Sequence, residues 1–258
     1  MKKILFIFIV MAASYAEPEY RKLILDNDLK VILVSDEDYN KSSASMCIRA
    51  GSLSDPKEYQ GLAHFLEHML FLGTEKYPDV DDYSSYLRSN GGYSNAYTAE
   101  DHTNYHYEVY HNAFEGALDR FSQFFIAPLF KQEYTQREMN AVNSEYQKNL
   151  EQDYWRMRQV KRNLYNSNHP ANHFEIGTLE TLSNVNRAVL LDFHKEYYSA
   201  NMMSLSIASN LDLDSLEALA RKYFSDIKNT NRERIKYPEN YLEEKDVLRL
   251  LKVKPVKD

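Results

Sequence analysis

The 258-residue sequence is poor in the residues that mark several classes of protein. It has one cysteine, Cys47, which excludes an internal disulfide framework. Glycine and proline number only seven each, which argues against a fibrous or disordered chain. Basic residues are outnumbered by acidic residues, 31 to 38, so the net charge is −7. An acidic chain has no general electrostatic reason to bind nucleic acid and favours basic or neutral peptides as partners.

Long apolar runs are also missing beyond the N-terminus, so the sequence predicts no membrane span. The first residues follow the pattern of a signal peptide, with Lys2 and Lys3 before the apolar run 4–11 and small residues up to Ala16. This run is too short for a bilayer, which takes about 20 helical residues. The alternative is a buried N-terminal strand. We expect residues 1–16 to be a signal peptide and the protein to be secreted, or periplasmic in a bacterium.

The rest of the chain alternates between strand-like and helix-like patterns. Short apolar or alternating runs predict strands at residues 22–25, 29–35, 45–50, 93–110 and 202–209. Apolar or polar helical patterns predict helices at 60–72, 82–87, 113–125, 132–162, 187–198 and 213–224. This order predicts an α+β fold with a largely antiparallel sheet and helices on one face. We expect one domain over residues 17–228. A linker and the start of a truncated second domain follow over 229–258, where residues 248–253 begin a new apolar run.

The predicted helix 60–72 carries the sequence His64-Phe65-Leu66-Glu67-His68. Residues four apart lie on one helical face, with Cβ atoms about 5–6 Å apart, so both imidazoles can reach one metal ion. Glu67 is directed to the same side and can accept a proton from water. This order of histidine and glutamate is the inverzincin signature of zinc peptidases. The alternative is an exposed helix with solvated histidines, but its apolar stripe predicts a helix anchored in the core.

A catalytic zinc site takes three protein ligands and leaves one position open, so a third ligand must come from elsewhere in the chain. Glu138 and Glu145 lie two helical turns apart in the predicted helix 132–162 and share a face. Either carboxylate could supply the third ligand, and the spacing does not choose between them. Without the histidines, this stretch would be predicted to be a solvated acidic face.

Several motifs, in one order, resemble the peptidase family M16, in the branch of insulin-degrading enzyme, pitrilysin and nardilysin. The resemblance covers residues 20–227 and is carried by His64–Thr74, Lys76–Pro78, Ser94–Thr98, His102–Tyr105, Glu115–Phe121, Pro128–Phe130 and Arg137–Glu145, and more weakly by Phe193–Ser199. It implies a zinc metalloendopeptidase that hydrolyses small peptides and binds one zinc ion per chain.

The resemblance also implies a role for each matching residue. Glu145 matches the third zinc ligand, beside His64 and His68, and Glu138 matches a residue that orients a ligand histidine. Glu67 matches the catalytic base. Asn95 and Ala96 match the edge strand that holds the peptide substrate in an extended conformation.

The sequence departs from the family in length. Members of this branch are long chains of four homologous domains, whose C-terminal half closes over the zinc site and contributes an arginine and a tyrosine. The run 248–256 resembles the start of the second domain. We therefore expect a peptide substrate and, as further partners, a separate C-terminal half or a second copy of this chain. Two functions are compatible with the sequence: a zinc endopeptidase, or a non-catalytic peptide-binding or scaffold module.

Overall fold

The computed structural model describes residues 17–248 and 250–255. The predicted signal peptide, residues 1–16, lies outside the described residues, as do parts of the run 248–256. Among the described residues, no helix is both long and apolar enough to cross a membrane.

Six strands form one mixed sheet in the order β1-β2-β6-β3-β5-β4. Their bounds are β1 Glu19–Ile24, β2 Lys30–Ser35, β3 Ser42–Ile48, β4 Tyr93–Thr98, β5 Thr103–Val109 and β6 Met203–Ser209. β2 and β6 pair in parallel, and every other neighbouring pair is antiparallel. The predicted, largely antiparallel sheet is therefore confirmed. Within the described part of the chain, β4 is an edge strand that pairs with β5 alone.

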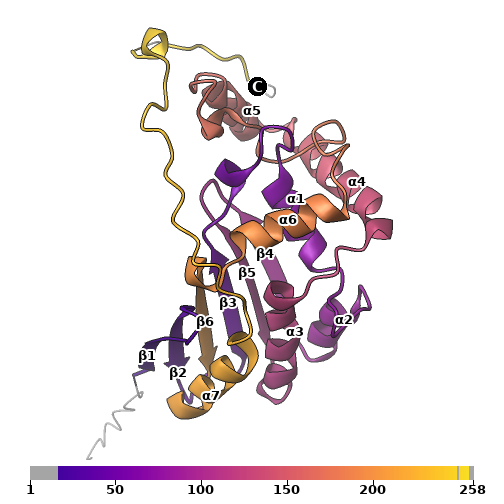
Figure 1. Ribbon diagram of the computed structural model, residues 1–258, viewed down its shortest axis with the longest axis vertical. Coiled ribbons are helices and arrows are strands. Elements are labelled where there is room, and N and C mark those ends of the chain that lie inside the picture. Colours follow the sequence, from indigo (N-terminus) through magenta and orange to yellow (C-terminus); the bar gives the residue numbers. More distant parts are fainter. Residues whose placement is uncertain (1–16, 249, 256–258) are drawn as a thin grey trace, which may run out of the picture.

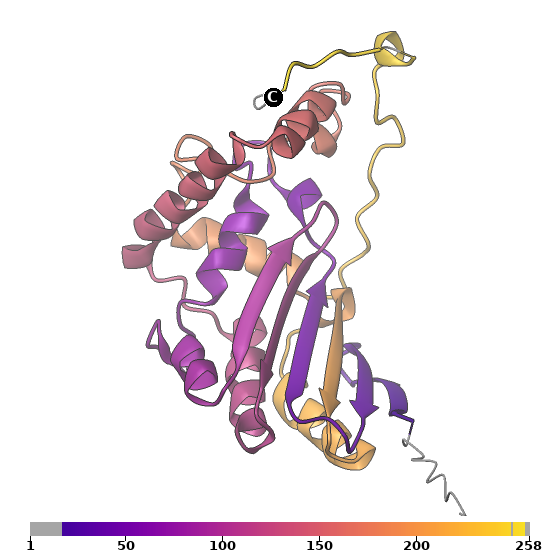
Figure 2. The ribbon, with the colours of Figure 1, turned by 180° about the vertical axis from the view of Figure 1, so that it is seen from behind.

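The larger helices lie on one face of the sheet, which is turned toward the viewer in Figure 1 and away in Figure 2. Their bounds are α1 Leu62–Leu70, α2 Asp82–Ser89, α3 Phe114–Ile126, α4 Gln132–Asn149, α5 Asp153–Arg162, α6 Arg187–Tyr197 and α7 Leu213–Phe224. Strand side chains alternate accordingly. In β5, Thr103, Tyr105, Tyr107 and Val109 are buried, whereas the residues between them are partly exposed. The α+β class with helices on one face is confirmed.

The structure breaks the predicted helix 132–162 into α4 and α5. Gln152 adopts an extended backbone conformation, with φ −112° and ψ 127°, and its carbonyl accepts hydrogen bonds from the amides of Trp155 and Arg156. Neither proline nor glycine marks this break in the sequence. As a consequence, α5 takes a new direction beyond the end of the sheet (Figure 1).

The C-terminal apolar run adds no strand to the sheet in its described residues. Within residues 229–255, no described residue belongs to a strand of the sheet, and 250–255 have no regular secondary structure. Leu242 forms an isolated bridge with Tyr165, and the segment extends along the molecule toward α5 (Figure 1). An apolar run needs a neighbouring strand to form a ladder, which the described part of the chain does not provide. The division at residue 228 stays a prediction.

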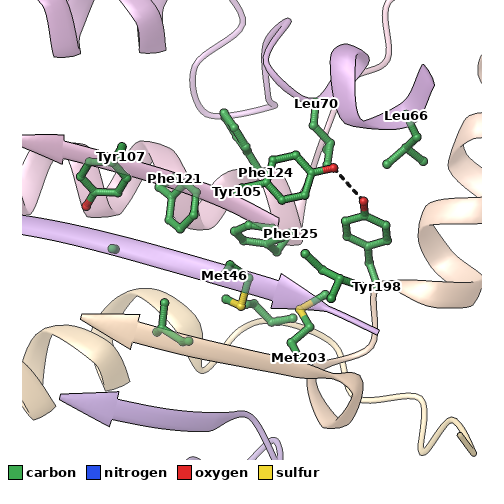
Figure 3. Packing of buried hydrophobic residues seen from close by; sticks show 14 of the residues in the cluster. Met46, Leu66, Leu70, Tyr105, Tyr107, Phe121, Phe124, Phe125, Tyr198 and Met203 are labelled. Carbon is green, nitrogen blue, oxygen red and sulfur yellow. Dashed lines mark hydrogen bonds between the residues drawn. The ribbon is translucent and has the colours of Figure 1, made fainter. Parts of the chain in front are cut away.

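Aromatic side chains fill the core between the sheet and its helices (Figure 3). Phe121 of α3 lies with its ring 5.1 Å from that of Tyr107 and 5.1 Å from that of Phe125. Close to α1, the buried hydroxyl groups of Tyr105 and Tyr198 form a hydrogen bond of 2.8 Å, which satisfies both polar ends inside the core.

Replacement of Phe121 by alanine tests this core. Phe121 is 1% exposed, so Phe121→Ala removes a whole buried ring and leaves a cavity. We expect the free energy of unfolding to fall by about 3–5 kcal/mol in urea denaturation. Tyr20, which is 62% exposed, provides the control, and Tyr20→Ala should change it by less than about 0.5 kcal/mol. Equal losses in the two variants would contradict this placement of the core.

Candidate metal centre

Helix α1 is fixed to the core by its apolar residues. Leu62, Phe65 and Met69 are at most 1% exposed, and they hold the opposite side of the helix toward a cleft. At the start of the helix, the carboxylate of Asp55 accepts hydrogen bonds from the amides of Gly61 and Ala63, at 2.8 and 2.7 Å. A carboxylate at this end satisfies amides that have no partner within the helix and interacts favourably with the helix dipole.

The two histidines of α1 present the same nitrogen to the cleft. Nδ1 of His64 lies 2.8 Å from the carbonyl oxygen of Ile176, and Nδ1 of His68 lies 3.6 Å from a carboxylate oxygen of Glu138. Both Nδ1 atoms therefore face acceptors of the protein. Their Nε2 atoms face a single oxygen, Oε2 of Glu145, at 3.5 Å from His64 and 3.8 Å from His68.

These three donor atoms fit a zinc ion. Nε2 or Nδ1 of each histidine and a carboxylate oxygen of Glu145 lie within 4.8 Å of one another. Zinc bonds to nitrogen and oxygen of about 2.0–2.2 Å in a tetrahedron place ligand atoms about 3.3–3.6 Å apart. The observed separations of 3.5 and 3.8 Å are close to that value. Two imidazoles and one carboxylate form a donor set that zinc prefers.

The charges of these residues depend on one another. Burial would lower the pKa of His68, but the carboxylates of Glu138 and Glu145 outweigh it and raise this pKa to about 9. In return, His68 lowers the pKa of both glutamates. Arg137 also donates a hydrogen bond of 2.9 Å to Glu138. Without a metal ion, a proton on His68 thus supplies the positive charge that the two carboxylates favour.

Glu67 lies beside the donor atoms and is only 7% exposed. Burial raises its pKa, opposed by the two neighbouring histidines and by a hydrogen bond from Thr98. The hydroxyl of Thr98 donates a hydrogen bond of 2.5 Å to Oε2 of Glu67 and leaves Oε1 to other partners. A buried carboxyl group with a raised pKa is suited to accept and return a proton.

The cleft around these groups has a volume of about 1080 Å³ and is bordered by α1, the edge strand β4, α4 and α5. Asn95 and Ala96 lie on β4 and line the cleft. Their side chains point to opposite faces of the sheet. Asn95 pairs with His106 on the exposed face, and Ala96 pairs with the buried Tyr105. Any role that these two residues share toward one peptide must therefore come from their backbone.

Three contacts of the site have no signal in the motifs. Ile176 contributes a backbone carbonyl, which any residue type provides, so its identity predicts nothing. Glu175 and Arg158 line the cleft, but they come from a loop and from the second half of the predicted long helix. Thr98 does lie in a motif that resembles the family, although its hydrogen bond with Glu67 could not be inferred from spacing.

Two family models match the sequence. The model for insulinase (peptidase family M16) matches residues 30–168, more than half of the chain, and includes all the residues of the candidate site except Glu175 and Ile176. The model for the peptidase M16 inactive domain matches residues 184–257 and crosses the predicted boundary at residue 228.

Curated relatives and solved structures agree with these models. The chain is 46% identical to the A-factor-processing enzyme of Saccharomyces cerevisiae over 94% of its length, and 46% identical to the insulin-degrading enzyme of Homo sapiens over 93%. A crystal structure of pitrilysin matches 90% of the chain with a TM-score of 0.87 and 38% identity. A protease from Helicobacter pylori shares the fold, with a TM-score of 0.73 at 21% identity, over 88% of this chain and 54% of that one. The chain spans about a quarter of the two curated relatives and of pitrilysin, 24% and 25% respectively.

The relatives correct the prediction of a secreted protein, which is wrong. One of them, 47% identical over 85% of the chain, is a peroxisomal insulin-degrading enzyme-like protein of Arabidopsis thaliana. An apolar run behind two lysines also occurs outside signal peptides, and a pattern of this length identifies one only weakly. The zinc and peptidase chemistry of the relatives, in contrast, agrees with the donor atoms found here. By its sequence and its fold, this chain belongs to the insulinase family of peptidases, M16.

Proposed function

We propose that this chain is the zinc-binding part of an endopeptidase that hydrolyses small peptides. His64, His68 and Glu145 would hold one zinc ion, Glu138 would orient His68, and Glu67 would act as the base. The observation that carries this proposal is the position of Glu67 beside three donor atoms that lie within 4.8 Å of one another.

Each residue has a chemical task in peptide hydrolysis. Zinc, when bound, supplies a Lewis acid that polarises the scissile carbonyl and acidifies water. Glu67 removes a proton from the attacking water and returns it to the nitrogen of the departing amine. Thr98 holds one oxygen of Glu67, which limits the rotation of the carboxylate. Glu138 has a carboxylate oxygen 3.6 Å from Nδ1 of His68, and this charge would favour the proton on Nδ1 and leave Nε2 free for the metal ion.

The substrate class follows from the edge strand and from the charge of the cleft. β4 has no second neighbour among the described strands, so an extended peptide can pair with its backbone near Asn95 and Ala96. The cleft contains many more acidic than basic side chains: Glu67, Asp81, Glu100, Asp101, Glu138, Glu145 and Glu175 against Arg158. Even with a divalent cation bound, this surface favours neutral or basic peptides. Two relatives are named for action on insulin and on A-factor, which supports small peptides as the class.

A second candidate function is a non-catalytic peptide-binding or scaffold module. It is favoured by the wide cleft, which has a volume of about 1080 Å³. In the family, the arginine and tyrosine that also bind substrate lie in the C-terminal half. Loss of one preorganised donor costs about 100-fold or more in rate. The further partners that we propose for this site are a C-terminal half of that kind or a second copy of this chain.

Replacement of Glu67 separates these two functions. Glu67→Gln keeps the shape of the side chain but removes the base, so we expect cleavage of a quenched fluorescent peptide to fall by about 10²–10⁴-fold. Bound zinc, measured by elemental analysis, should remain unchanged. If the wild-type chain binds zinc stoichiometrically but cleaves no peptide, the endopeptidase function is contradicted and only the peptide-binding module remains. Addition of a separately expressed C-terminal half would then show whether that half makes the chain cleave the peptide.

The third ligand is tested on α4. Glu145→Gln should weaken zinc binding, measured by competition with a chelator, by more than about 100-fold, because loss of a group that only orients a ligand already costs 10–100-fold. Glu133 lies exposed in the first turn of the same helix, and Glu133→Gln is the matched control with no expected change. Similar zinc affinities of the two variants would rule out Glu145 as a ligand.

The raised pKa of His68 predicts how pH affects the zinc-free protein. Its folded pKa of about 9 exceeds the ordinary 6.5, so its protonated form stabilises the fold. That contribution is fully present below pH 6.5 and is lost as pH rises through about 9. We expect the free energy of unfolding, measured in urea with a chelator present, to fall over this range by on the order of 2 kcal/mol. His68→Gln should lack this fall, and an unchanged slope in that variant would contradict the assignment.

A further inference from the structure

The segment Phe174–Gly177, between α5 and α6, packs directly on the start of α1. Gly61 and Gly177 have positive φ angles of 90° and 95°, and a Cβ atom on Gly61 would lie only 2.3 Å from Cα of Gly177. The two backbones therefore touch at a distance that side chains would prevent. The amide of Phe174 also donates to the side chain of Gln60 at 2.7 Å. Through these contacts the carbonyl of Ile176 comes within 2.8 Å of Nδ1 of His64.

One residue before this carbonyl, Glu175 is bound by two arginines of α5. Arg158 donates to its two carboxylate oxygens at 3.0 and 2.7 Å, and Arg162 lies 2.7 Å from Oε1. The side chains of Arg162 and Glu175 are 7% and 16% exposed, so solvent screens their attraction less than at the surface. A carboxylate with hydrogen bonds to both oxygens has little freedom to rotate. We call Arg158, Glu175 and Arg162 the α5 ion-pair cluster.

We propose that the α5 ion-pair cluster positions His64 for metal binding. The cluster fixes Glu175, the next residue supplies the carbonyl that accepts from Nδ1 of His64, and Nε2 is thereby directed to Glu145 and the metal. This inference depends on the proposed zinc site. It assigns to α5 a task that the ligands themselves do not reveal. His68 receives its acceptor from a side chain of α4, whereas His64 receives one from a backbone that α5 holds in place.

The geometry explains why a charged cluster is used. A loop carbonyl has no rotamer of its own, so its position depends on the side chains that anchor its neighbours. The contacts that hold Phe174–Gly177 include the hydrogen bond from the amide of Phe174 to Gln60 and the packing of Gly177 on Gly61. The ring of Phe174 also lies against Tyr146 and Arg162, Ile176 is buried in the core, and Glu175 forms the ion pairs. The ion pairs are the contact that a single isosteric substitution can remove. Glu175→Gln retains the size of the side chain while it removes the charge that both arginines share.

The experiment uses the full chain and two measurements. The first is the NMR signal of the Nδ1 proton of His64 in the zinc-free protein, which should exchange slowly with water because Ile176 accepts it. The second is zinc affinity by competition with a chelator. In Glu175→Gln we expect faster exchange of this proton and zinc binding weaker by about 10–100-fold. Arg158→Gln, at a side chain that is 34% exposed, should change both measurements in the same direction without a risk to folding.

Asp119→Asn is the matched control. Asp119 also has a side chain that is 16% exposed and binds Lys76 and Tyr77, but it has no contact with His64 or with residues 174–177. Asp119→Asn should leave both measurements unchanged. Arg158→Lys keeps the positive charge, so its proton exchange and zinc affinity should lie between those of the wild type and those of Arg158→Gln. If Glu175→Gln and Arg158→Gln behave like the control, the proposal is overturned. If the wild type binds no zinc, the proposed function fails, while the Nδ1 proton still tests the positioning of His64.

Discussion

Burial of one face of α1 is the interaction on which the rest of the site depends. The helix has nine residues, and isolated helices shorter than about 12–15 residues are marginal in water. Its stability must therefore come from Leu62, Phe65 and Met69 in the core and from the cap that Asp55 provides. Because the apolar residues fix the rotation of α1, they also decide that His64 and His68 face the cleft. The geometry of the donor atoms is thus a property of the core.

The sequence predicts those parts of the structure in which chemically distinctive residues fall on a regular spacing of apolar residues. Histidines four residues apart on an apolar stripe predict a common helical face, and the structure confirms the helix. Local alternation also predicts extended structure at residues 22–25, 29–35 and 93–110, where the structure has β1, β2, β4 and β5. The spacing alone did not decide whether Glu138 or Glu145 is the third ligand. The structure places Glu145 near both Nε2 atoms and Glu138 near Nδ1 of His68, and their roles as ligand and orienting residue stay predictions.

The parts that could not be predicted depend on contacts between distant residues. β6 lies between β2 and β3, although more than 150 residues separate it from either, and no local period carries that information. The break between α4 and α5 has no proline or glycine, so the pattern of residues 132–162 remains helical throughout. The carbonyl of Ile176 has no residue preference at all. The described residues of the apolar run near 248–253 show the converse, since they form no strand: a local apolar run is insufficient without a partner strand.

The break at Gln152 connects these observations. A continuous helix would carry residues 153–162 onward along the axis of α4, whereas the observed turn brings Arg158 and Arg162 to Glu175. Arg158 lies 4.0 Å from Glu100 in the turn between β4 and β5, so α5 also approaches the edge strand proposed to bind the peptide. One side chain thus contacts both the loop behind His64 and the end of the peptide-binding edge. A peptide that displaces Arg158 from Glu100 would alter the electrostatic surroundings of Glu175, and through Ile176 the surroundings of a proposed zinc ligand. The helix break is therefore the structural condition that places one arginine between the loop behind His64 and the end of the edge strand β4.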